Sequence, residues 1–441
     1  MKDHPSPAGA HAPPRAQRRR TPLLTLVTVS GISSLGTSMT LLAVPWFVLQ
    51  NTGSGTSTGL VAAAESLGLL CSAVLAGPVV DRLPARATSV AADAVTALAI
   101  GIIPLLHATV GLPLPALIAA VFVVGAARGP ADTAKQVLLA DAMRAADVTN
   151  ERGTSAVEGV RRIGFMAGAP LAGLLVATAG PVRTLCADMT ALLVSAVLVV
   201  ILVPRAAPVS ENTQETSYRR ELREGWQQLR SDRLLGAMTA VLMVTNALDG
   251  ALNGVLYPAY GSRVLHSSAL LGAVITAIGA GALLGSVLHG WAGHRWPRRA
   301  VFVGGFVLVG GVRCAMLAAE PSPPVLLAVL AVSGLGSGIV GPLMMSVAYE
   351  RVPERLRGRI FGLLVAGALA ATPLGMLTAG ILLDRLGLTS ALLATGAVYL
   401  GVTLAPLVFP VWGQLDAGRR EPRAVGAAVP AGEPNAAAPV P

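Results

Sequence analysis

Aromatic and charged side chains are scarce in this chain of 441 residues. Aromatic residues make up 4% of it and charged residues 13%, whereas a soluble domain carries roughly 25% charged residues. Lysine occurs only as Lys2 and Lys135. Together with a hydrophobic content of 53%, this composition excludes an ordinary soluble domain and leaves little chain for a soluble catalytic one.

Residues that bind metals or form disulfides are few as well. The three cysteines, Cys71, Cys186 and Cys314, each fall inside an apolar stretch, and the six histidines form no ligand cluster. This spacing indicates neither a disulfide framework nor a metal site. The sequence also shows no nucleophile–base pair and no phosphate-binding loop. We therefore expect no enzyme, no metal, no cofactor, and an ion gradient as the energy source.

Long apolar stretches dominate the rest of the chain. About twelve of them approach or exceed the ~20 residues needed to cross a bilayer. Six lie within residues 23–203 and six within 234–412. The sequence therefore predicts two six-helix bundles over these ranges. Residues 1–22 and 413–441 are expected to be disordered tails, and residues 204–233 a linker that contains an amphipathic helix.

Arginine produces the net charge of +10 and is unevenly distributed among the loops. Alternate loops are rich in arginine, whereas the loops between them carry only Arg183, Arg263 and Arg385. This alternation is the positive-inside pattern of membrane proteins and not a nucleic-acid-binding surface. We therefore expect a multi-pass protein of the plasma membrane, in contact with lipids, with both termini and the linker in the cytoplasm and no bound nucleic acid.

A short charged turn occurs twice. The first copy is Gly77-Pro-Val-Val-Asp81-Arg82-Leu-Pro-Ala-Arg86, and the second is Gly290-Trp-Ala-Gly-His294-Arg295-Trp-Pro-Arg298-Arg299. Gly290 follows Gly77 by 213 residues (290 − 77), which is about half the chain. A repeat at this distance indicates two related halves, an arrangement common among transporters.

The first turn resembles the signature loop of the major facilitator superfamily, Gly-x-x-x-Asp-Arg-x-x-Arg-Arg, with Ala85 in place of one arginine. The resemblance implies an all-α membrane protein of twelve transmembrane helices in two pseudo-symmetric six-helix bundles. It also implies that Asp81 meets the positive end of a helix in the other half and stabilises one conformation. The implied gating loop comprises Gly77, Asp81, Arg82, Arg86, Arg295 and Arg299.

Residues 45–54, 221–225 and 352–359 resemble the drug:proton antiporter branch that contains macrolide exporters and the enterobactin exporter. The branch implies that the chain exports a hydrophobic drug, antibiotic or natural product by proton antiport with alternating access. Export of a siderophore or other anionic metabolite is the alternative. We expect a monomer that binds a small molecule and protons. Members of this branch often carry an acidic residue in the first span where this chain has Thr37.

The fifth apolar stretch contains small residues at regular spacing. They resemble the antiporter motif of drug exporters, with Ala169 inserted into the usual Gly-Pro pair. Small residues let two helices approach closely, and proline can bend a helix. Ordinary helix packing is the alternative interpretation. The residues of this motif are Gly164, Gly168, Pro170 and Gly173.

Charges inside membrane spans are costly and indicate function. Asp249 has Asn246 and Asn253 about one turn to either side, which places three polar groups on one helix face. We expect this face to line the central cavity as a proton or substrate site, with a packing network as the alternative. Glu65 could load a proton if it is shielded from water, or be an end-of-helix residue wetted from outside. Arg128 resembles an arginine linked to proton coupling in drug antiporters.

Five further intramembrane charges have less defined roles. Asp132 and Lys135 are expected to form an ion-pair network at the cytoplasmic end of the fourth span. Arg313 is placed near the outer end of the ninth span, where it can snorkel. Asp93 and Asp188 have no evident partner in the sequence.

Overall fold

The computed structural model describes residues 15–109, 111, 113–204, 227, 230–352 and 356–417. Side chains at 15–19, 74–82, 294, 358–359 and 417 are outside this description. Throughout the described part of the chain, the regular structure is helical. The all-α prediction is therefore confirmed.

The N-terminal bundle consists of six long helices. They are α1 (Arg15–Thr52), α2 (Gly55–Arg82), α3 (Ala85–Thr109), α4 (Leu114–Ala146), α5 (Asn150–Ala179) and α6 (Pro181–Leu202). The turn from α5 to α6 is made at Gly180, whose φ of 85° favours glycine over residues with a side chain. Gly387, with φ 79°, makes the corresponding turn in the C-terminal bundle.

The C-terminal bundle repeats this order with more irregular helices. Its first span joins α8 (Arg233–Ala251), η1 (Leu252–Leu256), α9 (Tyr257–Tyr260) and η2 (Gly261–Leu265), and its second is α10 (Ser268–Ala292), followed by the turn η3 (Gly293–Arg295). The third span joins α11 (Arg298–Phe306), η4 (Val307–Val312) and α12 (Arg313–Ala318), and the fourth is α13 (Pro323–Arg351). The remaining elements are α14 (Arg357–Leu386), α15 (Leu388–Thr403), α16 (Ala405–Val408), η6 (Pro410–Gly413) and α17 (Gln414–Ala417). Segments η1, η2 and η4 are π-helical, which often marks functional sites.

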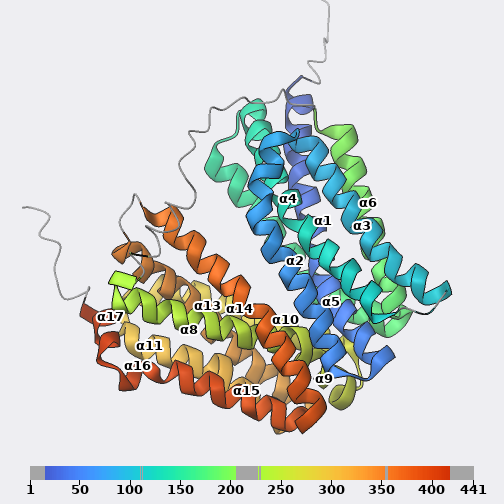
Figure 1. Ribbon diagram of the computed structural model, residues 1–441. Coiled ribbons are helices and arrows are strands. Elements are labelled where there is room, and N and C mark those ends of the chain that lie inside the picture. Colours follow the sequence, from blue (N-terminus) through green and yellow to red (C-terminus); the bar gives the residue numbers. More distant parts are fainter. Residues whose placement is uncertain are drawn as a thin grey trace, which may run out of the picture.

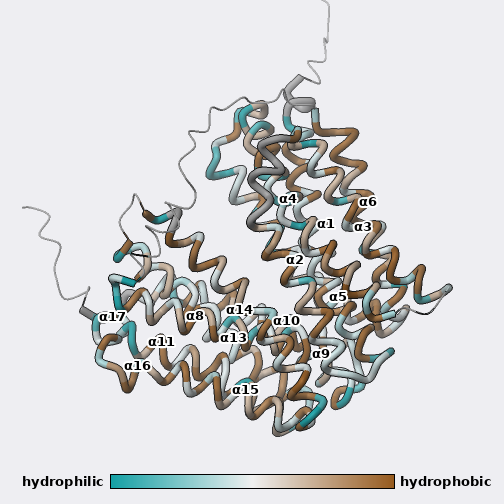
Figure 2. The backbone as a smooth tube through the Cα atoms, viewed as in Figure 1, coloured by the Kyte–Doolittle hydropathy of each residue, from teal (hydrophilic) through white to brown (hydrophobic). Residues whose placement is uncertain are grey.

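Eleven helices in the described residues are long and apolar enough to cross a membrane. α2, with 28 residues, is the remaining long helix of the N-terminal bundle. Hydrophobic residues occur along much of each bundle, as Figure 2 shows, and Leu98 and Leu374 are 65% and 63% exposed. Such a surface suits lipid and not water. These features agree with the predicted twelve-helix membrane fold.

The two bundles form a V in Figure 1. They meet near α9 and diverge toward the ends at which α1 begins and α17 lies. At the meeting point one apolar core contains residues of both bundles, among them Phe47, Val61, Leu256 and Leu383. Separate apolar clusters fill the diverging arms, one around Leu26 in the N-terminal bundle and one around Phe302 in the C-terminal bundle. Each arm therefore has its own core, and the shared core closes one end of the V.

Glycines at helix contacts repeat with the same 213-residue offset as the charged turns. A Cβ on Gly125 of α4 would lie 2.1 Å from the carbonyl oxygen of Glu65 in α2. A Cβ on Gly338 of α13, 213 positions later (338 − 125), would lie 1.8 Å from the carbonyl oxygen of Ala282 in α10. In each half, the second and fourth spans therefore pack backbone to backbone through an equivalent glycine.

Helix bounds differ from the expected segment limits at both ends of the chain. Helix α1 begins at Arg15 and so includes part of the segment 1–22 that was expected as a tail. Elements η6 and α17 extend from Pro410 to Ala417, and Trp412 is buried against Phe302 of α11. Most of the linker 204–233, with its expected amphipathic helix, lies outside the described residues.

Adding one methyl group at these glycines should destabilise the fold. Gly125→Ala and Gly338→Ala each force a Cβ against a backbone carbonyl, and we expect a cost of about 1–3 kcal/mol from overpacking. The matched control is Gly304→Ala in α11, where a Cβ meets nothing within 4 Å and alanine should favour the helix. Melting temperatures in detergent should fall for the first two variants and not for the control. Equal melting temperatures for all three variants would contradict this packing.

Candidate functional site

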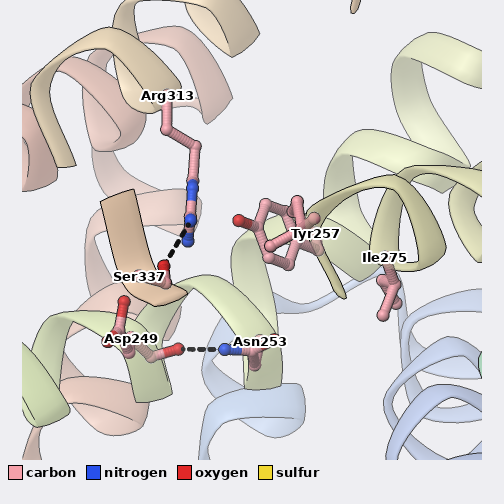
Figure 3. A pocket seen from close by; sticks show the side chains of 7 residues that line it. Asp249, Asn253, Tyr257, Ile275, Arg313 and Ser337 are labelled. Carbon is pink, nitrogen blue, oxygen red and sulfur yellow. Dashed lines mark hydrogen bonds between the residues drawn. The ribbon is translucent and has the colours of Figure 1, made fainter. Parts of the chain in front are cut away.

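The C-terminal bundle encloses a polar cavity of about 210 Å³. Its polar lining comes from three spans and includes Asp249 of α8, Tyr257 of α9, Arg313 of α12 and Ser337 of α13. Figure 3 shows the tip of Arg313 and the hydroxyl of Tyr257 directed toward one another across this space. Ile275 and Ile278 of α10 provide apolar walls. The cavity thus combines charged, hydrogen-bonding and apolar groups.

Arg313 lies in the last part of the ninth span, as expected, but it does not snorkel. Its side chain is buried, where Nε donates to Ser333 Oγ at 2.9 Å and an Nη donates to Ser337 Oγ at 3.3 Å. The preceding Gly310 and Gly311 lie directly against Tyr399 and Leu400 of α15. This close approach of α15 buries the end of η4 immediately before Arg313. The glycine pair before the arginine was the available sequence signal.

Several buried polar atoms around the cavity have no hydrogen-bond partner within the described part of the structure. They are Asp249 Oδ1 and the hydroxyl oxygens of Tyr257 and Tyr399. Arg313 lies within electrostatic range of Asp249, and the Tyr399 hydroxyl lies near enough to interact with the Asp249 carboxyl, although the geometry falls short of a regular hydrogen bond. Buried polar atoms are normally hydrogen-bonded, and an exception calls for an explanation such as a proton, an ion or a ligand. These atoms make the cavity a candidate binding site.

Only two of the three polar residues expected on one face reach this cavity. Asn253, in η1, lines it and donates from Nδ2 to the backbone oxygen of Asp249 at 2.8 Å. Asn246 donates instead to its own helix, at the carbonyl of Leu242 over 2.8 Å, and is not among the lining residues. The π-helical segment η1 begins between Asp249 and Asn253, so simple α-helical spacing does not describe this face.

In the N-terminal bundle, Glu65 and Arg128 form an ion pair. Arg128 Nη1 lies 3.2 Å from Glu65 Oε1, and the two side chains are 18% and 9% exposed. Gly125, one turn before Arg128, packs on the backbone of Glu65 and brings the two helices together. A neighbouring arginine stabilises the charged form of a carboxylate. Glu65 is thus sheltered from solvent and has a cationic partner.

A second, more deeply buried ion pair joins α3 and α4. Lys135 Nζ lies 2.9 Å from Asp93 Oδ1, and their side chains are 6% and 3% exposed. Lys135 also donates to Ser33 Oγ of α1 at 2.8 Å, and Ser195 of α6 donates to Asp93 Oδ2 at 2.9 Å. Four helices therefore meet at this pair. The partner of Lys135 is Asp93, and not Asp132 as the sequence suggested.

The gating-loop residues are described in part. Gly77, Asp81 and Arg82 lie in α2, within the stretch whose side chains are outside the described residues. An Nη of Arg86 donates to the carbonyl of Val200 in α6.

In the second copy of the turn, Arg295 is exposed, and Arg299 Nε donates to the carbonyl of Pro406 at 2.9 Å. Arg298 forms two hydrogen bonds with the carboxylate of Glu350 in α13. Arg86, Arg298 and Arg299 thus tie helix ends together within their own bundle.

The glycines of α5 form two different contacts. Gly164 and Gly168 lie against α1, where an added Cβ would come within 2.4 Å of the Gly31 carbonyl and 2.6 Å of Ser38 Cβ. Gly173 lies across the bundle boundary, where a Cβ would come within 2.5 Å of the carbonyl of Ser268 in α10. Pro170 lies between them and contacts Gly272 of α10. The motif therefore packs α5 on both bundles.

Comparisons with known proteins identify the family. The family model of the Major Facilitator Superfamily matches residues 26–250 and 239–435, and the chain belongs to this superfamily. It is therefore a multi-pass membrane transporter, as the charged turns indicated.

Among its relatives is the "Multidrug efflux pump Tap" of Mycolicibacterium fortuitum, 29% identical over 402 residues, which are 90% of this chain and 98% of the relative. The protein of the same name from Mycobacterium tuberculosis (strain ATCC 25618 / H37Rv) is 30% identical over 405 residues, covering 90% of this chain and 95% of the relative. These names agree with the drug-exporter branch predicted from the sequence.

Solved structures share the fold at low identity. The nucleoside transporter NupG aligns with a TM-score of 0.71 and 13% identity over 87% of this chain and 98% of that one. A POT family transporter in complex with 5-aminolevulinic acid aligns with a TM-score of 0.69 and 13% identity over 91% and 100% of the two chains. These similarities establish the arrangement of helices.

The ion pair of Lys135 and Asp93 should show strong energetic coupling. Lys135→Met leaves Asp93 buried without a cation, which should cost about 3–5 kcal/mol. The double variant Asp93→Asn, Lys135→Met removes both charges and should recover most of that loss. Melting temperatures in detergent of the two single variants and the double variant test this coupling. Purely additive losses would show that the two charges do not stabilise one another.

Proposed function

We propose that this chain exports a hydrophobic drug, antibiotic or natural product across the plasma membrane by proton antiport with alternating access. The Tap relatives are named as multidrug efflux pumps over nearly their whole length, which supports drug export. Asp249, a carboxyl that lines a cavity of the C-terminal bundle and has one oxygen without a regular hydrogen bond in the described structure, is the observation that carries the coupling proposal. The protein acts as a monomer with both termini in the cytoplasm.

The chemistry of the cavity favours proton binding over anion binding. A carboxylate that loses water on burial is costly to keep charged unless a cation lies beside it. Arg313 is within electrostatic range of Asp249, but its guanidinium donates hydrogen bonds to Ser333 and Ser337. Export of a siderophore is the less supported alternative, because the Tap relatives are named as multidrug efflux pumps.

Alternating access is supported by a contact at the closed end of the V. Asp384, near the end of α14, accepts hydrogen bonds from the backbone N–H groups of Gly55 and Thr56 at 2.6 and 2.8 Å, and from Ser54 Oγ at 2.9 Å. These donors lie at the start of α2, so the carboxylate caps the positive end of a helix in the other bundle. We call this contact between Asp384 and the start of α2 the latch, because it joins the two bundles at this end.

The sequence around this latch repeats that of the gating loop. Gly380-Ile-Leu-Leu-Asp384-Arg385-Leu386 has the same Gly-x-x-x-Asp-Arg-Leu pattern as residues 77–83. Asp81 is the last residue but one of α2. It lies at the end of α2 that is far from the Asp384 contact, on the side where α14 begins. In our proposal Asp81 caps α14 when the other side closes, so that the two latches act in turn. The arginine-rich loops support a cytoplasmic location for the diverging ends, and in our proposal this conformation is inward-open.

Neutralising Asp249 should abolish proton-driven export. Asp249→Asn keeps the size of the side chain but removes the titrating group, and we expect ethidium accumulation in an efflux-deficient host to match that of the empty host. The matched control is Asp141→Asn, which removes a carboxylate paired with the exposed Arg144 outside the cavity. Each variant is checked for membrane expression. Wild-type efflux by Asp249→Asn would refute its role.

Locking the latch should stop transport. In a background of Cys71→Ser, Cys186→Ala and Cys314→Ala, the pair Ser54→Cys, Asp384→Cys should react with a short methanethiosulfonate cross-linker. Cross-linking prevents the bundles from separating at this end, so efflux should cease and return after reduction. Either single cysteine variant serves as the control. Undiminished efflux by fully cross-linked protein would contradict alternating access at this end.

A further inference from the structure

Asp188 is a buried carboxylate of the N-terminal bundle without a cationic partner. It lies in α6 and is 2% exposed. Its Oδ2 accepts a hydrogen bond from Thr40 Oγ1 of α1, 148 residues away in the sequence. Its Oδ1 is buried and has no hydrogen-bond partner in the described structure. Glu65 and Asp93, two other buried carboxylates of this bundle, are each paired with a cation.

The backbone of α1 is shaped to receive this oxygen. A Cβ on Gly36 would lie 2.1 Å from Asp188 Oδ1, so a side chain at position 36 would force the carboxylate to move. Thr40 follows one turn later on the same face of α1 and supplies the hydroxyl donor. Helix α1 has no acidic residue of its own between Thr21 and Thr52. Helix α6 thus provides a carboxylate inside a pocket that α1 forms.

The charged groups of the neighbouring helices leave Asp188 uncompensated. Helix α6 packs against α1, α3 and α5. Helix α1 has no titratable residue between Thr21 and Thr52, and α5 has none from Ile163 to Ala179. On α3, Arg86 is bonded to the end of α6, Asp93 is paired with Lys135, and His107 packs edge-on against Phe47.

Two more distant charges also act on Asp188. Arg128 acts on it more strongly than Glu65 and with opposite sign, but Arg128 is paired with Glu65 and not with Asp188. On α6 itself, Arg183 is exposed and Cys186 is half-buried. An ionised carboxylate in this position would be buried without a counter-charge, which costs several kcal/mol in proteins. Taking up a proton removes that cost.

We infer that Asp188 is a proton-binding site of the transport cycle, with the proton carried on Oδ1. In the conformation seen here the proton neutralises the buried carboxyl, while Thr40 continues to donate to Oδ2. When α1 moves relative to α6 and water enters, the O–H bond breaks and the proton leaves, so that the carboxylate is hydrated instead of buried. Since α1 packs against α5 and against η1 and α9 of the other bundle, the protonation state of Asp188 is linked to the contact between bundles. This inference rests on the proposed proton coupling.

Infrared difference spectroscopy of the reconstituted protein tests the site without a transported substrate. Between about pH 5 and pH 9, the range over which buried carboxyls titrate, wild type should show a carbonyl band of a protonated carboxylic acid that disappears with rising pH. Asp188→Asn should lose one such band, and it keeps an oxygen that can accept from Thr40. Thr40→Val should keep the band and change its midpoint, which a purely structural role for Asp188 would not predict.

Ethidium efflux distinguishes this inference from the proposed function. If wild type exports ethidium in a protonophore-sensitive way, Asp188→Asn should lose uphill efflux and keep downhill exchange. The inference is overturned, and the proposed function stands, if wild type exports ethidium while Asp188→Asn keeps every titrating band and full uphill efflux. If wild type exports no ethidium but the band is lost in Asp188→Asn, the site stands and the proposed drug export is called into question.

Discussion

A charge inside a membrane is tolerated when the protein itself supplies a partner, and this requirement organises both bundles. In the N-terminal bundle, Lys135 joins Asp93 and two serines, so that four helices converge on one ion pair. In the C-terminal bundle, Arg313 is held by two serines of α13 beside the cavity of Asp249. The hydrogen bonds of these buried charges fix the helices around them. In our proposal, carboxyl groups without full compensation are the ones that exchange protons.

Close backbone packing supplies the rigidity that such a mechanism needs. Within each half, equivalent glycines press the second and fourth spans together, which makes each bundle a stiff unit. Between the halves, the contacts concentrate at one end of the V, where Asp384 caps α2 and Gly173 meets α10. A stiff pair of bundles joined at one end can rock around a central site. Contacts at the two ends of α2 and α14 would then alternate.

Much of the fold was predictable because it depends on local or repeated features. The length of an apolar stretch predicts a membrane span, and arginine-rich loops indicate one side of the membrane. The repeated charged turns indicate two related halves. The partners of intramembrane charges were not predictable, because they depend on how helices rotate against one another. Asp93 and Lys135 are 42 residues apart, and Asp188 and Thr40 are 148 apart. Arg313 was expected to snorkel, but the glycine pair before it buries that helix against α15. Asn246 was assigned to the cavity from its helical spacing to Asp249, but its side chain donates to its own helix at the carbonyl of Leu242.

The central claim is that drug export is coupled to protons through carboxylates buried in the bundles. Purified protein in liposomes, with a pH difference imposed across a membrane of zero electrical potential, tests it most directly. Ethidium movement and internal pH are followed together. The account predicts that ethidium moves in the direction opposite to the protons and that the pH difference collapses faster when ethidium is present. It also predicts that reversing the pH difference reverses the transport. Ethidium transport at the same rate with no pH difference, and without proton movement, would contradict it.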